Sequence, residues 1–138
     1  MLIDTGPLVS FLDRREPQHA WVRARMRDCA APLQTCEAVL SEAMHLLRRA
    51  PGGPESLRAL LQRGLVILSV SFDLRRELAP VLTLLRAYDD LPMSLADACL
   101  VRMAELDDQA VVFTTDRDFL IYRKHGRQPV PLFFPPEE

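Results

Sequence analysis

Five short segments rich in apolar or β-branched residues are spaced along the chain, and each ends at a polar residue or a turn. They are residues 1–4, 31–35, 65–70, 110–115 and 130–134. Their length and composition are typical of strands, and the apolar run LVILSV at 65–70 is typical of a strand covered on both faces. The pattern therefore predicts a buried sheet of short strands.

Between these segments, apolar residues recur every three or four positions, as they do on one face of a helix. The predicted helices begin near residue 5 and then cover 17–30, 36–50, 54–63, 73–88 and 94–106. Pro7 fits the first turn of its helix, and Pro80 is expected to kink the helix that contains it. Thr35 and Ser94 are expected to cap the helices that follow them.

Strands that alternate with helices predict an α/β fold of three layers, in which helices cover both faces of a mostly parallel sheet. The chain has 138 residues, enough for one domain with a substantial core, and its sequence contains no internal repeat, long linker or low-complexity segment. We therefore expect a single domain over residues 1–138. Open parallel sheets bind their ligands at the carboxyl ends of the strands, so the residues at those ends are the first candidates for a functional site.

Acidic residues follow two of the predicted strands. Asp4 closes the first strand, and Asp116 closes the strand at 110–115, with Asp118 two residues farther along. Because the carboxyl ends of parallel strands meet at one edge of the sheet, we expect these side chains to lie close together.

Two predicted helices carry further acids near their apolar faces. Glu42 shares a helix face with Val39 and Leu46, so it borders the apolar stripe. Asp97 falls on the apolar arc of its helix, beside Ala104, and is expected to point into the protein. All of these acids can therefore converge at one end of one sheet.

The same acids have structural interpretations that need no chemistry. Asp97 lies three residues after Ser94 and can complete a capping box. Asp4 can cap the helix that follows it, and Glu42 can be an ordinary acid at the border of a helix. The acids after the strand at 110–115 can simply shape a turn.

Convergence of the acids would narrow the chemistry. Two carboxylates about 4 Å apart repel by roughly 4 kcal/mol at an effective dielectric constant of 20. Four of them cannot stay ionised together without a cation or strongly raised pKa values. A set of carboxylates without Cys or His favours Mg²⁺ or Mn²⁺, and such ions serve phosphate chemistry by activating water and stabilising charge on phosphoryl oxygens.

Composition narrows the class of protein. Hydrophobic residues make up 49% of the chain, which excludes a disordered protein. No apolar run reaches the roughly 18 residues of a membrane span, and no basic leader precedes an apolar stretch. The three cysteines are odd in number and form no C-x-x-C pair, so we expect reduced thiols and a cytoplasmic protein. The three histidines lack the spacing of zinc ligands.

Charge leaves the partner open. The net charge of −2 does not indicate a nucleic-acid partner by itself. Of the 17 basic residues, 16 are arginine and only Lys124 is lysine. Arginine is the better ligand for phosphate, so the distribution of these residues matters more than their sum.

Three other uses of an early aspartate are excluded. The DTG at 4–6 is typical of aspartic proteases, but those have an all-β body, whereas most of this chain is predicted to be helical. A haloacid-type phosphatase needs a second aspartate two residues after the first, where this chain has Gly6. A receiver domain needs an early acid pair and a lysine after a later strand, and neither is present.

Four stretches of the chain carry the converging acids: LIDTGPLVSFLD, VLSEAMHLL, SLADACLVRMAE and VVFTTDRDF. In order and spacing they resemble the four acidic motifs of PIN-domain ribonucleases, and most closely those of the VapC-like toxins of bacterial toxin–antitoxin pairs. The resemblance covers essentially the whole chain. Each motif alone is a weak signal, but the four in order are a specific one.

The resemblance implies a Rossmann-like α/β fold whose acids bind Mg²⁺ or Mn²⁺ and hydrolyse RNA phosphodiester bonds. It implies a quartet of catalytic and metal-binding acids, namely Asp4, Glu42, Asp97 and Asp116. Asp4 and Asp97 would be the direct metal ligands, Asp118 would assist, and Thr114 would orient the loop by hydrogen bonding.

The resemblance also implies partners. Proteins of this kind act on RNA, usually form homodimers, and are silenced by a small antitoxin whose tail enters the acidic groove. The candidate phosphate contacts are Arg14, Arg15 and Arg117, each of which can also be solvated surface charge. The alternative function is a non-catalytic PIN-like scaffold that binds RNA or protein. The presence of all four acids argues against it, because a scaffold has no use for their repulsion.

Overall fold

The computed structural model describes residues 1–136 and contains a five-stranded sheet in which neighbouring strands pair in parallel. The strands are β1 (Leu2–Ile3), β2 (Leu33–Thr35), β3 (Val66–Leu68), β4 (Val112–Phe113) and β7 (Leu132–Phe133). Their order across the sheet is β3-β2-β1-β4-β7. This arrangement confirms the α/β class and the parallel sheet.

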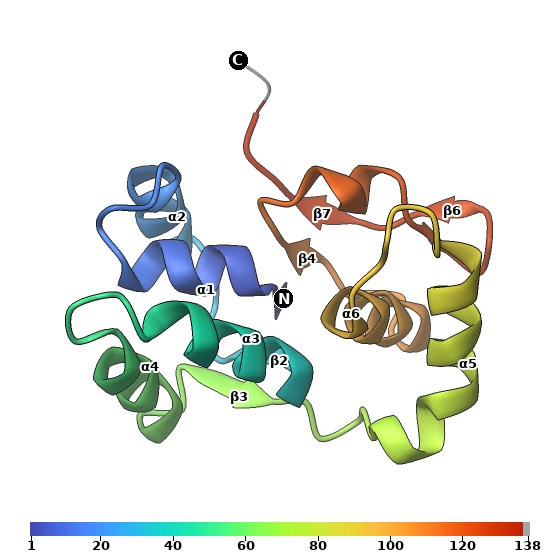
Figure 1. Cartoon of the computed structure of the whole chain (residues 1–138), viewed down its shortest axis with the longest axis horizontal. Helices are drawn as coiled ribbons and strands as arrows, with labels where there is room; N and C mark the ends of the chain where they lie inside the picture. Colours follow the sequence, from blue (N-terminus) through green and yellow to red (C-terminus); the bar gives the residue numbers. More distant parts are fainter. Residues whose placement is uncertain (137–138) are drawn as a thin grey trace.

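Helices connect the strands and pack around the sheet. They are α1 (Thr5–Leu12), α2 (His19–Met26), α3 (Glu37–Leu47), α4 (Gly53–Gln62), α5 (Leu74–Ala87) and α6 (Leu95–Leu106), followed by the 3-10 helix η1 (Arg117–Leu120). Figure 1 shows α2 and α4 on one side of the molecule and α5 on the other, with α1, α3 and α6 between them. Among residues 1–136, no helix is long and apolar enough to span a lipid bilayer.

The position of β1 creates the switch point of the sheet. From β1 the chain passes to β2 and then to β3 on one side, and it returns through α5 and α6 to β4 on the other side of β1. Leu2 accordingly pairs with Gln34 of β2 and with Val112 of β4. The residues that follow β1 and β4 therefore lie at the same end of the sheet, where such folds bind ligands.

A second, antiparallel pair of strands follows η1, and the sequence pattern does not predict it. It consists of β5 (Arg123–Lys124) and β6 (Gln128–Pro129). The turn between them contains His125 and Gly126, both with positive φ (52° and 76°). The sequence of this hairpin is polar and lacks the alternation of apolar and polar residues that predicts a strand. A hairpin of two-residue strands does not need an apolar face of its own.

An aromatic cluster joins α2 to the sheet. Trp21 packs against Phe113 of β4 and Phe133 of β7, with ring centroids 5.7 and 5.8 Å apart. The rings of Phe113 and Phe133 are themselves 5.0 Å apart. Such contacts add to the free energy gained from burying the rings, so they fix α2 over the strands.

Two local predictions are wrong. The segment 65–70 is not covered on both faces along its length: Val66 is buried, but Leu68 at the end of β3 is 40% exposed and Val70, which follows the strand, is 99% exposed. Thr35 does not cap α3, whose N-cap is Cys36. The hydroxyl of Thr35 instead donates a hydrogen bond of 2.9 Å to the carbonyl of Ile3 in β1. Pro80 lies inside α5 without ending it.

The Thr35 bond gives a test of what holds β1 to β2. Replacing Thr35 by Val keeps the shape of the side chain but removes a buried donor, so we expect a loss of about 1 kcal/mol in the free energy of unfolding, measured by urea denaturation. The control is Thr83→Val. Thr83 also donates to a backbone carbonyl, that of Ala79 at 3.0 Å, but it is exposed on α5, so stability should change by less than about 0.5 kcal/mol. Equal losses in both variants would contradict this interpretation.

Candidate active site

Asp4 is a buried carboxylate held by two fixed donors. It follows β1 and is the N-cap of α1, where its Oδ1 accepts a hydrogen bond of 2.7 Å from the Thr5 N–H. Its Oδ2 accepts a hydrogen bond of 2.7 Å from the hydroxyl of Thr114, just after β4. The side chain is only 4% exposed. The capping interpretation and a placement at the switch point are therefore both correct for this residue.

Thr114 links two of the four acids. Its hydroxyl donates to Asp4 and also accepts a hydrogen bond of 3.0 Å from the backbone N–H of Asp116. One buried hydroxyl therefore fixes the end of β4 relative to the end of β1. Gly6 allows this approach, because a Cβ at that position would lie 2.5 Å from Oγ1 of Thr115.

Asp97 lies on the first turn of α6 and is 8% exposed, which agrees with its place on the apolar arc of the helix. Its backbone N–H donates to Oγ of Ser94 at 3.0 Å, so Ser94 caps α6 as predicted. Its Oδ2 accepts a hydrogen bond of 2.8 Å from the hydroxyl of Tyr122. The cap accounts for the hydrogen bond of the Asp97 amide, but it does not account for a carboxylate that is buried.

Glu42 and Asp116 are exposed. Oε2 of Glu42 accepts a hydrogen bond of 3.0 Å from the hydroxyl of Thr5, which follows Asp4. The predicted apolar border around Glu42 is only partly present, because Leu46 is 53% exposed. Asp116 is the N-cap of η1 and accepts a hydrogen bond of 2.9 Å from the N–H of Asp118, so these two acids do shape a turn.

The pKa values show that the four acids share one electrostatic environment. Burial, helped by the charges of Asp97 and Asp116, raises the pKa of Asp4 to about 7, even though the hydrogen bonds from Thr114 and Thr5 lower it. Burial also raises the pKa of Asp97, with added repulsion from Asp116 and Glu42. Acids from four separate motifs therefore act on one another, as the convergence argument requires.

The donor set fits a divalent cation in its chemistry. Buried, mutually repelling carboxylates are the groups that a hard cation stabilises, and carboxylate oxygens are the ligands of Mg²⁺ and Mn²⁺. The geometry is looser than a closed ligand cage: within residues 1–136, no three His, Cys, Asp or Glu side chains come together closely enough to hold a metal ion. Asp4 and Asp97 are fixed by donors, whereas the exposed Glu42 and Asp116 would have to adjust around an ion.

Two of the three candidate phosphate contacts lie away from the acids. Arg14 and Arg15 follow the C-terminal end of α1, whose eight residues span roughly 12 Å from the Asp4 end. Arg15 is held by Asp13, with both pairs of atoms 3.0 Å apart, and donates to the carbonyl of Arg49. Arg117, in η1 between Asp116 and Asp118, is the candidate beside an acid of the site.

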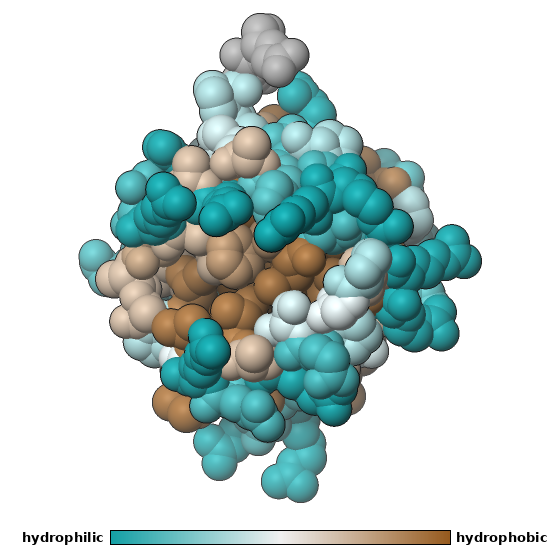
Figure 2. Space-filling view, turned by 90° about the vertical axis from the view of Figure 1, so that its left-hand side faces the viewer, coloured by the Kyte–Doolittle hydropathy of each residue, from teal (hydrophilic) through white to brown (hydrophobic). Residues whose placement is uncertain are grey.

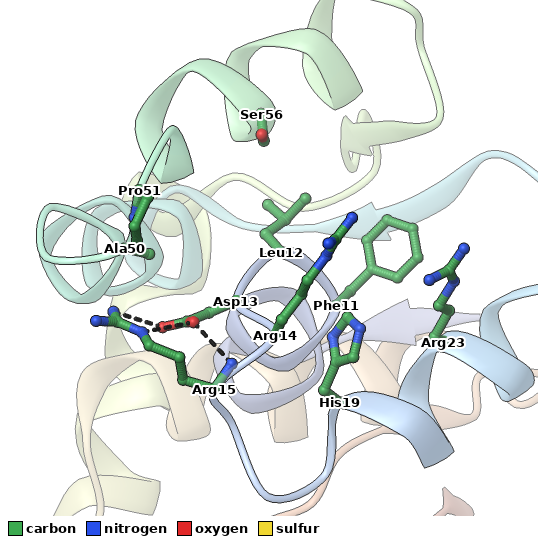
Figure 3. A pocket seen from close by; sticks show the side chains of 10 residues that line it. All are labelled: Phe11, Leu12, Asp13, Arg14, Arg15, His19, Arg23, Ala50, Pro51 and Ser56. Carbon is green, nitrogen blue, oxygen red and sulfur yellow. Dashed lines mark hydrogen bonds and ion pairs between the residues drawn. The ribbon is translucent and has the colours of Figure 1, made fainter.

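The two arginines border a separate pocket of about 520 Å³ between the ends of α1, α2 and α3. Figure 3 shows Arg14 and Arg23 on either side of the Phe11 ring, and the bonds from Arg15 to Asp13. The hydrogen bonds that Arg15 donates to Asp13 hold the pKa of the Asp13 carboxyl below its usual range. This pocket is therefore distinct from the acidic site.

Sequence reasoning missed two polar groups at the acids. Thr5 bridges Asp4 and Glu42, and Tyr122 binds Asp97. Thr5 lies inside the first motif, so its hydroxyl could have been included. Tyr122 lies 25 residues from Asp97 in an apolar run, and only the folding of the segment after β4 brings it to α6.

The raised pKa of Asp4 predicts how stability depends on pH. In EDTA, the free energy of unfolding should fall as the pH rises from about 4 to about 7, because over that range the folded protein keeps a proton that the unfolded chain has released. The effect is at most roughly 4 kcal/mol, at 1.36 kcal/mol per pKa unit. Asp4→Asn should flatten the dependence in urea denaturation series, and exposed Asp90→Asn should not. An unchanged slope in Asp4→Asn would show that Asp4 titrates normally.

Comparison with known families agrees with this geometry. The family model described as the PIN domain matches residues 1–124, which include all four acids. No curated protein matches the chain. PIN domains are in general nucleases, and they typically use divalent metal ions. With a match over most of its length and a parallel sheet that carries acids at its switch point, the chain belongs to the PIN-domain family.

Proposed function

We propose that this protein is a metal-dependent endoribonuclease that hydrolyses RNA phosphodiester bonds with Mg²⁺ or Mn²⁺. One observation carries the proposal: two buried carboxylates, Asp4 and Asp97, lie at the switch point of the sheet and have pKa values raised by burial and by neighbouring acids. Without a bound cation, the repulsion between these buried carboxylates destabilises the fold. A function for their negative charge, such as binding a divalent cation, would explain why they are there.

Each acid has a distinct place in the proposed site. A bound Mg²⁺ or Mn²⁺ would supply an activated water and stabilise charge on the phosphoryl oxygens. Asp4 and Asp97, which are fixed by hydrogen bonds, are the proposed direct ligands. Glu42 and Asp116 complete the ligand set from exposed positions, and Asp118 shapes the turn that carries Asp116.

The rival function is a PIN-like scaffold that binds RNA or protein without cutting. A scaffold would be more stable with neutral residues at positions 4 and 97, because both side chains are buried beside other acids. The arrangement therefore favours catalysis. Arg117, which lies between Asp116 and Asp118, is the best-placed of the proposed RNA contacts, and Arg14 and Arg15 could contact only a more distant part of the strand.

Asp97→Asn separates catalysis from capping. We expect this variant to lose Mn²⁺-dependent cleavage of a labelled structured RNA while its free energy of unfolding in EDTA stays equal or rises, because the amide removes repulsion. In the wild type, Mn²⁺ at ~100 times its dissociation constant should add about 2.7 kcal/mol to the free energy of unfolding, and the variant should lose most of that gain. The control is Asp108→Asn, an exposed acid beyond the end of α6.

The opposite result is equally specific. If Asp97→Asn still cleaves RNA and only unfolds more easily, by about 1 kcal/mol, then Asp97 serves the helix end alone and the scaffold function is favoured.

We further propose that the protein is the toxin of a toxin–antitoxin pair, inhibited by a small protein partner. An apolar groove supports the existence of such a partner. It has a volume of about 280 Å³ and is lined by Phe11, Met26, Leu33, Leu60 and Leu65 together with Arg23 and Arg27. Figure 2 shows an apolar area on this face, framed by hydrophilic residues. Arginines beside an apolar groove favour an acidic segment with apolar anchors.

Two leucines of equal exposure test this groove. Leu65 lines it and Leu68 does not, and each is 40% exposed. Leu65→Asp should weaken inhibition by the proposed small antitoxin protein by about tenfold or more, measured as the inhibitor concentration that halves RNA cleavage. Leu68→Asp should leave inhibition within about twofold. Equal inhibition of both variants would place the partner elsewhere.

We also propose that the protein is a cytoplasmic homodimer. Leu78 and Leu82 lie one turn apart on α5 and are 46% and 53% exposed, which supports a homodimer through an exposed apolar face. The three cysteines are unpaired thiols, which supports a cytoplasmic protein.

A further inference from the structure

The hydroxyl of Tyr122 is a buried polar group that has no role in the function proposed above. The side chain is fully buried, and its hydroxyl donates a hydrogen bond of 2.8 Å to Oδ2 of Asp97. Ser94 accepts a hydrogen bond from the Asp97 amide, and its hydroxyl also lowers the pKa of the Asp97 carboxyl, but by less than the hydrogen bond from Tyr122 does. The bond therefore acts on the acid itself rather than on the end of α6.

The ring of Tyr122 is held from two sides. Phe119 lies 5.1 Å from it between ring centroids, with the planes at 77°, and Tyr88 lies 5.0 Å from it at 66°. The ring of Tyr88 makes this contact, whereas its hydroxyl accepts a hydrogen bond of 2.9 Å from the N–H of Arg123. Two edge-on aromatic contacts leave the phenol little freedom to move, so the position of its hydroxyl is set by the surrounding structure.

This aromatic trio also connects the motifs of the site. Phe119 belongs to η1, which begins directly after Asp116, and Tyr122 follows η1. Asp97 lies on α6, which precedes β4 in the chain, whereas η1 follows β4. The hydrogen bond from Tyr122 therefore ties the orientation of the Asp97 carboxylate to the placement of the segment that carries Asp116.

We propose that Tyr122 is a positioning residue of the nuclease site, which holds the Asp97 carboxylate in the orientation that binds the divalent cation. This inference rests on the proposed function. Groups that hydrogen-bond to ligating carboxylates set the orientation of those ligands, and their loss typically weakens metal affinity or activity by roughly 10–100-fold. The competing explanation is that Asp97 merely supplies an acceptor to a buried phenol, in which case Tyr122 serves stability alone.

Tyr122→Phe removes the hydroxyl and keeps the ring. The matched control is Tyr88→Phe, which makes the same change on the adjacent ring but removes an acceptor for the Arg123 amide instead of a donor to an acid. Mn²⁺ binding to the full chain without RNA is measured by titration calorimetry, and kcat and KM for a structured RNA are measured at saturating Mn²⁺. Stability in EDTA is followed in parallel.

We expect Tyr122→Phe to weaken Mn²⁺ binding by about tenfold or more and to lower kcat with little change in KM, and Tyr88→Phe to stay within about twofold of the wild type. Mn²⁺ affinity within twofold of the wild type in Tyr122→Phe overturns the inference, even if stability falls. A wild type that binds no Mn²⁺ overturns the proposed function as well, so the two failures are distinguishable.

A second variant covers the case in which Tyr122→Phe does not fold. Phe119→Leu keeps both the hydroxyl and Asp97 but removes one of the two rings that hold Tyr122 in place. A severalfold loss of Mn²⁺ affinity in this variant supports positioning by Tyr122, and unchanged affinity contradicts it.

Discussion

A carboxylate with almost no contact with solvent sits at the centre of the parallel sheet, and the rest of the site is arranged around its charge. Burial of Asp4 disfavours ionisation, and Asp97 and Asp116 disfavour it further. Only hydrogen bonds from Thr5 and Thr114 act in the other direction. The topology imposes this conflict, because β1 lies between β2 and β4 and its end cannot move away from theirs. Buried carboxylates with strongly raised pKa values are candidates for functional residues.

The four acids divide into a fixed pair and an adjustable pair. Asp4 and Asp97 are buried, and donors on other elements hold them in place. Glu42 and Asp116 are exposed, and their carboxylates accept hydrogen bonds from the Thr5 hydroxyl and from the Asp118 N–H, respectively. This division explains how the acids can repel one another without forming a closed group of ligands in residues 1–136.

Much of this arrangement can be predicted from the sequence, because it depends on local patterns. Alternating apolar runs and helical repeats predict the α/β class, and the same patterns locate the acids at strand ends and on the inner arc of α6. They do not predict the exposure of β3, because an edge strand and a central strand share one apolar pattern. The sequence also does not show how far Arg14 and Arg15 lie from Asp4, because the whole of α1 separates them from it. The role of Tyr122 depends on the tertiary fold, which no local pattern encodes.

The two hydrogen bonds to Asp4 also determine where a proton could reside on it. One lone pair of each oxygen is occupied by a donor, Thr5 N–H on Oδ1 and Thr114 O–H on Oδ2. An added proton must therefore use a remaining lone pair, and those are the lone pairs that a cation would need. Proton and cation compete for the same electrons at this carboxylate, and with its pKa near 7 the exchange falls within the neutral range of pH. A divalent cation bound at Asp4 would therefore be displaced by protons as the pH falls below about 7.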